Sequence, residues 1–443
     1  MMNIFFSITA LFAYFVAPQI YNSVFIQFIT LGFLIQAIYF IFKKSNGNYV
    51  NFYSIFYFSY FFVNFFYALI LYPIDPDFFP IFTLGFNENV INKSTALAWV
   101  VSSFIILGAN TKLLNNKIKY NYFYSHKKIT QITGILVIFF IIAVGKEFLS
   151  GNFTAQSVLS LYILQLVVCF FIVSSVAFFK NYNYQHSKVL YFFIAFIYVF
   201  LFLAVGDRGP ALSLLILILS MYSFYVKKIN ILVIFPILFL GSFLMYIIGV
   251  GRVADISTGS NIFLRGLTGL NMNLEDLYYV TSDLSSSSFT LYLGKDYVDE
   301  NGVNFGSTLI SDIIAVFPFF QGILNSAVDF EIKTSPTFFT EIALGNNASW
   351  GVGTNLISDV YISFGLIGCI FLFYFFGLLV EYSRRKLIEN NTFASNIIYF
   401  SLTSYALYLP RAGLFMPFKF IIWSLIIYYF LRSFSIIKPK VIK

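Results

Sequence analysis

The feature that most constrains this chain is a series of apolar runs, each about long enough to cross a lipid bilayer. Of its 443 residues, 59% are hydrophobic and only 10% are charged, whereas a soluble domain carries about 25% charged residues. Inside a bilayer, only helices and closed barrels satisfy their own backbone polar groups, and a helix needs about 20 apolar residues to cross. The sequence therefore predicts an all-α polytopic membrane protein with about 12 transmembrane helices.

The expected spans fall before and after one long polar segment. They are Met1–Ala17, Ile20–Phe42, Phe52–Tyr72, Ser94–Leu114, Ile129–Phe148, Val158–Phe179, Val189–Val205, Ala211–Val226, Ile229–Val250, Leu356–Val380, Phe393–Leu409 and Leu414–Leu431. The chain is thereby divided into residues 1–250 with spans one to nine, a large loop at 251–350, and residues 351–443 with the last three spans and the tail.

The charged residues predict which side each loop faces, because cytoplasmic loops are enriched in Lys and Arg. Most of the 27 basic residues lie in alternate loops, and those loops contain only Glu381 and Glu389 of the 19 acidic residues. We therefore expect both termini in the cytoplasm and the loop 251–350 outside it.

Several classes of site are disfavoured by composition. Cys169 and Cys369 lie inside apolar runs, and His126 and His186 lie in short basic loops far from any acidic cluster. No metal-ligand spacing and no Gly-rich phosphate loop is present. We expect no metal, no cofactor and no nucleic-acid partner.

Arginines on the outer, acidic side are the strongest functional signal, because they oppose the orientation bias. They are Arg208, in the turn Gly206–Pro210 between two spans, and Arg252, Arg265 and Arg411. The planar guanidinium group binds phosphate oxygens in pairs, so these side chains are candidates to bind the diphosphate of a lipid carrier. The alternative is that each one pairs with a nearby carboxylate such as Asp207 or Asp255.

The long loop has its own expected structure. Leu residues at helical spacing predict an amphipathic helix at Asn261–Tyr279, and Leu309–Leu324, broken by Pro318, indicates a re-entrant or interfacial helix. Polar and aromatic side chains suited to binding sugars are Tyr278, Tyr292, Trp350, Asn355 and Tyr361. The aromatic residues among them are equally typical of a membrane-interface belt.

Two carboxylates are candidate bases. Glu341 precedes a Gly- and Asn-rich turn, and Asp359 lies in the first turns of an apolar helix. A carboxylate in such a helix is expected to face a polar interior, although near a helix N-terminus it also complements the helix dipole. The residues alone do not choose between the two.

Two stretches resemble the O-antigen and oligosaccharide repeat-unit polymerases (Wzy-type). One is the turn Gly206-Asp-Arg-Gly-Pro210 before a Leu-rich span, and the other is the Gly-rich entry Gly351–Gly368 to the span after the loop. The resemblance implies a GT-C-like membrane fold. It also implies a metal-independent, inverting glycosyltransferase of the bacterial cytoplasmic (inner) membrane.

By that resemblance, a growing glycan would move from undecaprenyl diphosphate to a second lipid-linked repeat unit, for O-antigen lipopolysaccharide, capsule or exopolysaccharide. Arg208 with Glu341 or Asp359 would be catalytic. Besides lipid-linked oligosaccharides and membrane lipids, a chain-length regulator and a flippase are expected partners.

Three other functions remain alternatives. A flippase or other transporter would favour internal repeats and mid-membrane polar residues, and no repeat between the halves is visible. An O-antigen ligase often has an outer-loop histidine, which this chain lacks. A non-enzymatic scaffold would tolerate single Arg or Glu changes.

Overall fold

The computed structural model describes most of the chain. The described residues are 2–111, 122–123, 126–149, 158–180, 182, 188–205, 208–230, 281–317, 333–434 and 440–441, with single positions or pairs at 232, 236, 241, 243, 246–247, 250–251, 266–267, 278, 320 and 436. Its regular secondary structure is helical apart from the two-residue strands β1 (Tyr122–Phe123) and β2 (Lys440–Val441), which pair antiparallel. The predicted helical class is confirmed.

Seven helices of the described part are long and apolar enough to cross a membrane. They are α2 (Ser23–Ser45), α3 (Phe52–Phe61) continued by the π-helix η1 (Phe62–Leu71), α4 (Ile91–Asn110), α5 (Lys127–Leu149), α6 (Val158–Phe179), α8 (Arg208–Tyr225) and α17 (Leu356–Asn390). Shorter apolar helices are α1 (Met2–Phe15) and α7 (Val189–Val205). A polytopic membrane protein is therefore supported, and because most of 229–250 lies outside the described residues, the number of twelve stays a prediction.

The C-terminal region differs from its expected spans. The expected span Phe393–Leu409 is helical only over α18 (Phe393–Ser404), and a series of turns then leads to the 3-10 helix η7 (Leu409–Arg411). A 12-residue helix rises only about 18 Å, short of the roughly 30 Å of hydrocarbon. The last helix, α19 (Met416–Ser433), begins soon after η7.

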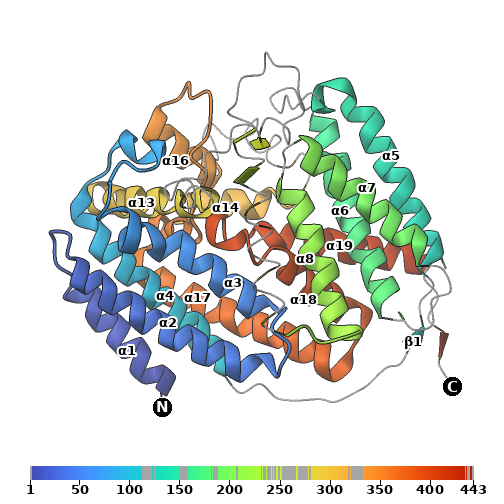
Figure 1. Cartoon of the computed structure of the whole chain (residues 1–443), viewed down its shortest axis with the longest axis horizontal. Coiled ribbons are helices and arrows are strands. Elements are labelled where there is room, and N and C mark those ends of the chain that lie inside the picture. Colours follow the sequence, from blue (N-terminus) through green and yellow to red (C-terminus); the bar gives the residue numbers. More distant parts are fainter. Residues whose placement is uncertain are drawn as a thin grey trace.

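The helices form two groups that meet at α17 and α18 (Figure 1). In the first, α4 lies against α1, α2 and α17. Glycines allow α4 and α17 to touch, since a Cβ at Gly108 would lie 2.0 Å from the Tyr374 carbonyl oxygen and one at Gly377 would lie 2.0 Å from that of Ile105. Small residues bring membrane helices together in this way. In the second group, α5, α6, α7 and α8 pack with α18 and α19.

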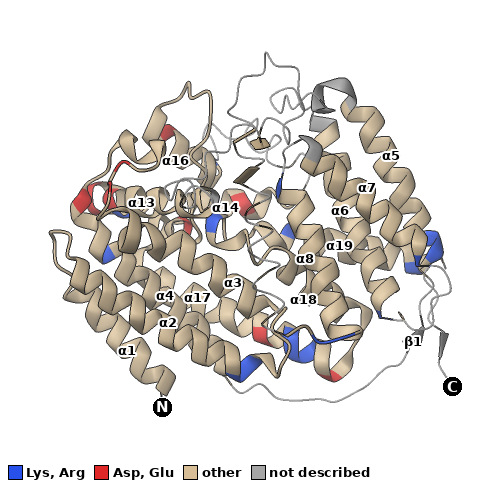
Figure 2. Ribbon diagram, in the orientation of Figure 1, with Lys and Arg blue, Asp and Glu red and all other residues tan. Residues whose placement is uncertain are grey.

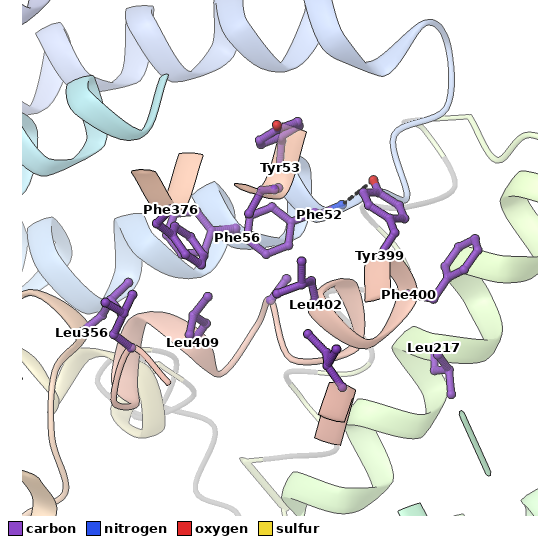
Figure 3. Packing of buried hydrophobic residues seen from close by; sticks show 14 of the residues in the cluster. Phe52, Tyr53, Phe56, Leu217, Leu356, Phe376, Tyr399, Phe400, Leu402 and Leu409 are labelled. Atoms are coloured by element: carbon purple, nitrogen blue, oxygen red, sulfur yellow. Dashed lines mark hydrogen bonds between the residues drawn. The ribbon is translucent and has the colours of Figure 1, made fainter. Parts of the chain in front are cut away.

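The hydrophobic core continues between the two groups (Figure 3). Phe52 and Phe56 on α3 lie near Phe376 on α17, and the Tyr399 hydroxyl of α18 accepts a hydrogen bond from the Phe52 amide at 3.5 Å. Leu217 of α8 lies at the other side of this cluster. The two groups therefore share one core.

One group of basic residues lies together at one end of the helices, at the lower side of Figure 2. Lys44 at the end of α2 contacts the buried Glu381 of α17 at 2.9 Å, and Arg384 and Arg385 contact the same carboxylate. Lys228, after α8, donates to the Asn46 carbonyl at 3.0 Å. The loops that the charge pattern assigned to one side thus meet at one end of the molecule, and most acidic side chains lie toward the other end.

At the opposite end, short helices from the second half of the chain run across the bundle (Figure 1). They are α12 (Ser282–Ser285), α13 (Ser288–Asn301), α14 (Ser307–Ile314) and α16 (Ser335–Leu344), with the 3-10 helices η2 (Pro80–Leu84) and η3 (Glu88–Val90) from the first half. Of the expected interfacial helix Leu309–Leu324, residues 309–314 are helical in α14, which starts at Ser307, and residues 318–319 and 321–324 lie outside the described residues. Of the expected helix Asn261–Tyr279, only 266–267 and 278 are described.

Helix α17 is broken near its start. Gly365 has φ 63° and ψ −156°, which is not helical and which glycine adopts most readily. The amide of Asn304, in the turn after α13, donates to the Ile362 carbonyl at 2.8 Å and so satisfies one group freed by the break. The segment Leu356–Phe364, which carries Asp359, is thereby held among the short crossing helices.

Candidate functional site

A cavity of about 440 Å³ lies where these crossing segments meet the second group of helices. Its lining comes from five separate parts of the chain: α6, α14, the start of α16, the segment before α17 and the segment from η7 into α19. The lining residues are Gln165, Asp312, Ala315, Thr334, Pro336, Gly353, Thr354, Arg411, Ala412, Gly413, Phe415, Met416, Lys419 and Phe420. The cavity thus combines two cations, a carboxylate and several apolar side chains.

Two carboxylates meet at the wall of this cavity beside Gly413. A Cβ built on Gly413 would lie 2.3 Å from Oδ2 of Asp312 and 3.4 Å from Oδ2 of Asp359. Asp359 is completely buried, and its Oδ2 accepts a hydrogen bond from the Leu414 amide at 3.2 Å. The absence of a side chain at position 413 therefore makes room for the carboxylate pair.

Hydroxyl groups surround the buried member of the pair. Thr308 of α14 and Ser335 of α16 lie beside the Asp359 carboxylate. Their hydroxyls also bond to Ser363 at 3.3 Å and to Thr354 at 2.6 Å. These contacts tie α14, α16 and α17 together around one carboxylate, so its position depends on all three.

Asp312 is the member of the pair that lines the cavity, and its pKa is raised to about 8. Burial is the larger cause, since it disfavours the charged carboxylate, and the nearby Asp359 adds to it. A carboxyl group with this pKa exchanges a proton near neutral pH. Perturbed carboxylates in a cavity are typical of catalytic acid–base groups.

Positive charge faces the same cavity. Arg411 ends η7, where its amide donates to the Tyr408 carbonyl at 3.0 Å, and Lys419 lies one turn into α19. Both α16 and α19 begin at the cavity, at Ser335 and Met416. Helix N-termini carry partial positive charge and free amide groups, which favour anions. The cavity therefore suits an anionic group beside an acid–base pair.

The candidates for anion binding are only partly brought together. Arg411 lines the cavity, whereas Arg208 begins α8 and is absent from that lining. The N-terminal part of α8 instead faces α6 and α18, since Pro210 and Ser213 border a small void with Phe171 and Ser404. Arg252 and Arg265 lie outside the described residues.

The two candidate bases, Asp359 and Glu341, occupy different surroundings. Asp359 belongs to the carboxylate pair, whereas Glu341 of α16 accepts a hydrogen bond from Lys333 at 2.6 Å and does not line the cavity. The ion pair with Lys333 therefore holds the Glu341 carboxylate outside the cavity lining. The geometry therefore favours Asp359, with Asp312, over Glu341.

Two of the candidate sugar-binding residues have structural roles instead. Asn355 is buried and caps α17. Its Oδ1 accepts from the Ile357 amide at 2.9 Å, and its Nδ2 donates to Asn64 at 3.0 Å. Tyr292 is completely buried, with ring centroids 5.1 Å from Phe86 and 5.9 Å from Tyr67. Their contacts within the protein leave neither side chain open to a sugar.

The other three are placed differently. Tyr361 is nearly buried, 3.1 Å from the Tyr14 hydroxyl and with Lys295 at 5.8 Å from its ring. It lies two residues after Asp359 and so points away from the carboxylate pair. Tyr278 packs near Phe66 and Phe78. Trp350 is half exposed and remains accessible.

Sequence reasoning missed Asp312 and Lys419. Both interrupt strongly apolar stretches, Leu309–Val316 and Phe415–Leu425. A charged residue in such a stretch is expected to face a polar interior, which is the argument that identified Asp359. The signal was therefore present in the sequence, but nothing local indicated that these residues would meet.

Comparison of the chain with known protein families, with curated proteins and with solved structures finds no match.

Proposed function

We propose that this chain is a glycan polymerase that uses lipid-linked substrates, and that the cavity beside Asp312 and Asp359 is its active site. The observation that carries the proposal is the meeting of a carboxylate pair with Arg411 and Lys419 in one cavity. A glycosyl transfer from a lipid diphosphate needs both parts, a base for the acceptor and cations for the departing diphosphate.

In the proposed reaction, the hydroxyl oxygen of the acceptor sugar forms a bond to the anomeric carbon of the donor. The bond between that carbon and the diphosphate oxygen breaks, and its electron pair stays with the diphosphate. The proton of the acceptor hydroxyl passes to the Asp312 carboxylate. A base with a pKa of about 8 combines useful basicity with a substantial ionised fraction near neutral pH.

The cations have a separate task in this scheme. Arg411 and Lys419 bind the diphosphate and stabilise the negative charge that grows on it as the sugar leaves. Preorganised groups of this kind are each worth about 3–4 kcal/mol in other enzymes. The helix starts at Ser335 and Met416 support the same charge. We assign Arg208 to the donor side as well, on the resemblance of its turn alone.

The charge distribution supports a location on the outer face of a bacterial cytoplasmic membrane. Lys44, Arg384 and Arg385 gather around Glu381 at one end of the helices, and the crossing segments with the cavity lie at the other end (Figure 2). Because cytoplasmic loops are enriched in Lys and Arg, we assign the basic end and both termini to the cytoplasm. The cavity then opens toward the side where lipid-linked repeat units are polymerised.

The test is chain extension by the purified protein. A synthetic repeat unit on undecaprenyl diphosphate is incubated with the protein in nanodiscs, and the products are separated on a gel. We expect a ladder of lengthening glycans, lost in Asp312→Asn and retained in Glu341→Gln. Single repeat units only, from wild-type protein that binds the substrate, would refute the proposed activity.

The break at Gly365 favours one second candidate, a proton-coupled transporter. Transporters place buried carboxylates beside interrupted helices, and Asp359 precedes such an interruption. Proteoliposomes separate the two functions: transport predicts movement of intact lipid-linked units driven by a pH gradient, with no new glycosidic bond.

A further inference from the structure

The outer side of α14 and of the turns that follow it carries a row of exposed apolar side chains. Ile310 and Ile313 lie on α14 and Phe317 lies in the turns after its end at Ile314. These three residues recur at three- and four-residue spacing and are 53%, 47% and 52% exposed. Phe320 continues the row, its ring centroid 6.4 Å from that of Phe317. Residues three or four apart share one face of a helix, and the turn hydrogen bonds from the Phe317 amide to Ile314 and from the Phe320 amide to Phe317 continue the coil past the end of α14. We call these four residues the α14 ridge.

The opposite side of α14 faces the interior. Thr308 and Ser311 are buried, and Asp312 and the adjoining Ala315 line the cavity. One short segment therefore has polar residues of the cavity on one side and exposed apolar side chains on the other. Exposed apolar rows of this kind mark contacts with lipid or with another protein, and this chain has helices suited to crossing a membrane.

The segment is also fixed to α19, whose first turns complete the cavity. The indole Nε1 of Trp423 donates to the Val316 carbonyl at 2.8 Å, just after α14 ends. On the cavity side of the same junction are Phe415, Met416 and Phe420. Apolar lining therefore continues from the charged part of the cavity into the first turns of α19, and the Trp423–Val316 hydrogen bond joins α19 to the chain directly before Phe317 of the ridge.

The size of the cavity limits what it holds. At about 440 Å³, it lies at the low end for sites that bind small molecules. There is room for a diphosphate and an adjoining sugar ring, but not for a long hydrocarbon chain as well. A lipid-linked substrate would need a second, apolar surface for its chain.

We infer that the α14 ridge binds the isoprenoid chain of a lipid diphosphate whose charged head occupies the cavity. This inference rests on the proposed function for the identity of the substrate and specifies how the protein selects it. The ridge distinguishes carriers by chain length, because each additional buried methylene group contributes to binding. A short chain ends before it covers Ile313 and Phe317.

Photolabelling tests the inference without requiring activity. Undecaprenyl diphosphate with a diazirine in its chain is added to the full-length protein in nanodiscs, and labelled peptides are identified by mass spectrometry. We expect label on 307–320 and on the facing part of α19. The double variant Ile313→Ser/Phe317→Ser should need at least fivefold more probe for half-maximal labelling. On the wild-type protein, geranyl diphosphate should compete poorly with the probe.

A matched control is available on α5. Ile135 and Phe139 have the same residue types at the same four-residue spacing and are 56% and 60% exposed. The double variant Ile135→Ser/Phe139→Ser should reach half-maximal labelling at the same probe concentration as the wild-type protein. Equal dependence in both double variants, label confined to other helices, or geranyl diphosphate competing as well as the long chain would each overturn the ridge assignment.

The outcome is separable from that of the proposed function. If the ridge is labelled and the short-chain diphosphate competes poorly, but no glycan ladder forms, the lipid-diphosphate site stands and the polymerase activity is refuted. If wild-type protein gave a glycan ladder with equal yield from long and short carriers, the polymerase would stand and the role of the ridge in binding the chain would be given up.

Discussion

Asp312 and Asp359 come from segments separated by a long stretch of chain, yet both carboxylates reach the same Gly413. Oδ2 of each aspartate lies within 3.4 Å of the point where a side chain at 413 would begin. Like charges this close disfavour ionisation of both groups, so the pair is held by surrounding structure. That relationship leads to the first predictions.

Gly413→Ala should disrupt the pair. The added methyl group would lie 2.3 Å from Oδ2 of Asp312, so the carboxylate must move, and we expect chain extension to fall at least tenfold. A misplacement of about 1 Å in an active site has an effect of this order or larger. Gly351→Ala is the control, since its methyl group would meet only the Thr340 hydroxyl at 3.3 Å. Equal activity in both variants would contradict the role given to the pair.

Asp359→Asn should shift the pH dependence of activity to lower pH. Removal of the Asp359 charge takes away one of the two causes that raise the pKa of Asp312, while burial remains. Because the base acts when ionised, activity rises with pH toward about 8 in wild type, and the rise should occur earlier in the variant. Arg411 and Lys419, which also line the cavity, are unchanged. An unshifted pH–rate profile would argue that Asp312 does not titrate in the reaction.

Asp312→Asn should stabilise the protein, more at pH 9 than at pH 5. In the folded state the pKa of Asp312 is about 8, against 3.8 for the free side chain. The folded state therefore holds a proton that the unfolded state releases, and stability falls as pH rises between those values. Asparagine has no such ionisation. Thermal unfolding in detergent at both pH values measures the difference, and a uniform change would count against the assignment.

Arg411→Ala should reduce chain extension by about 10²–10³, as for loss of one donor to a developing negative charge. Arg411→Lys should recover only part, because lysine cannot bind two oxygens with a fixed planar group. Arg208→Ala should have a smaller effect, since Arg411 lines the cavity and Arg208 does not. Gel analysis of glycan length ranks the three variants. A larger loss of activity in Arg208→Ala than in Arg411→Ala would place the donor site nearer to α8.

Glu381→Gln should destabilise the protein without a specific effect on catalysis. Glu381 is buried and is contacted by Lys44, Arg384 and Arg385, with the Tyr53 hydroxyl at 2.9 Å. Removal of one partner from a buried ion pair costs about 3–5 kcal/mol, because charge is left uncompensated. Glu389→Gln is the control on the same helix. A thermal unfolding temperature unchanged in Glu381→Gln would contradict this account.

Much of the architecture was predictable because it depends on local composition. Apolar runs such as Ile20–Phe42 and Leu356–Val380 form helices wherever a membrane is the solvent, and they correspond to α2 (Ser23–Ser45) and to most of α17 (Leu356–Asn390). The alternation of basic loops correctly grouped Lys44 with Arg384 and Arg385 at one end. The length of α18 was not predictable, since Tyr405–Leu409 is as apolar as the helix before it.

The candidate site was only partly predictable. Asp359 was identified because a carboxylate in an apolar helix needs a polar neighbour. Asn355 and Tyr292 were assigned to sugars from their residue type, yet they cap α17 and fill the core. Residue type alone does not tell which side of a loop helix is buried, because that depends on the elements that pack against it.

The sequence by itself determined that the chain is a bundle of apolar helices with a basic end, since hydropathy and charge act residue by residue. Only the tertiary structure decided that Asp312, Asp359, Arg411 and Lys419 meet. Their meeting depends on the break at Gly365, the end of α18 at Ser404 and the placement of α14 between cavity and surface. Such long-range packing has no signature in any single stretch of the chain.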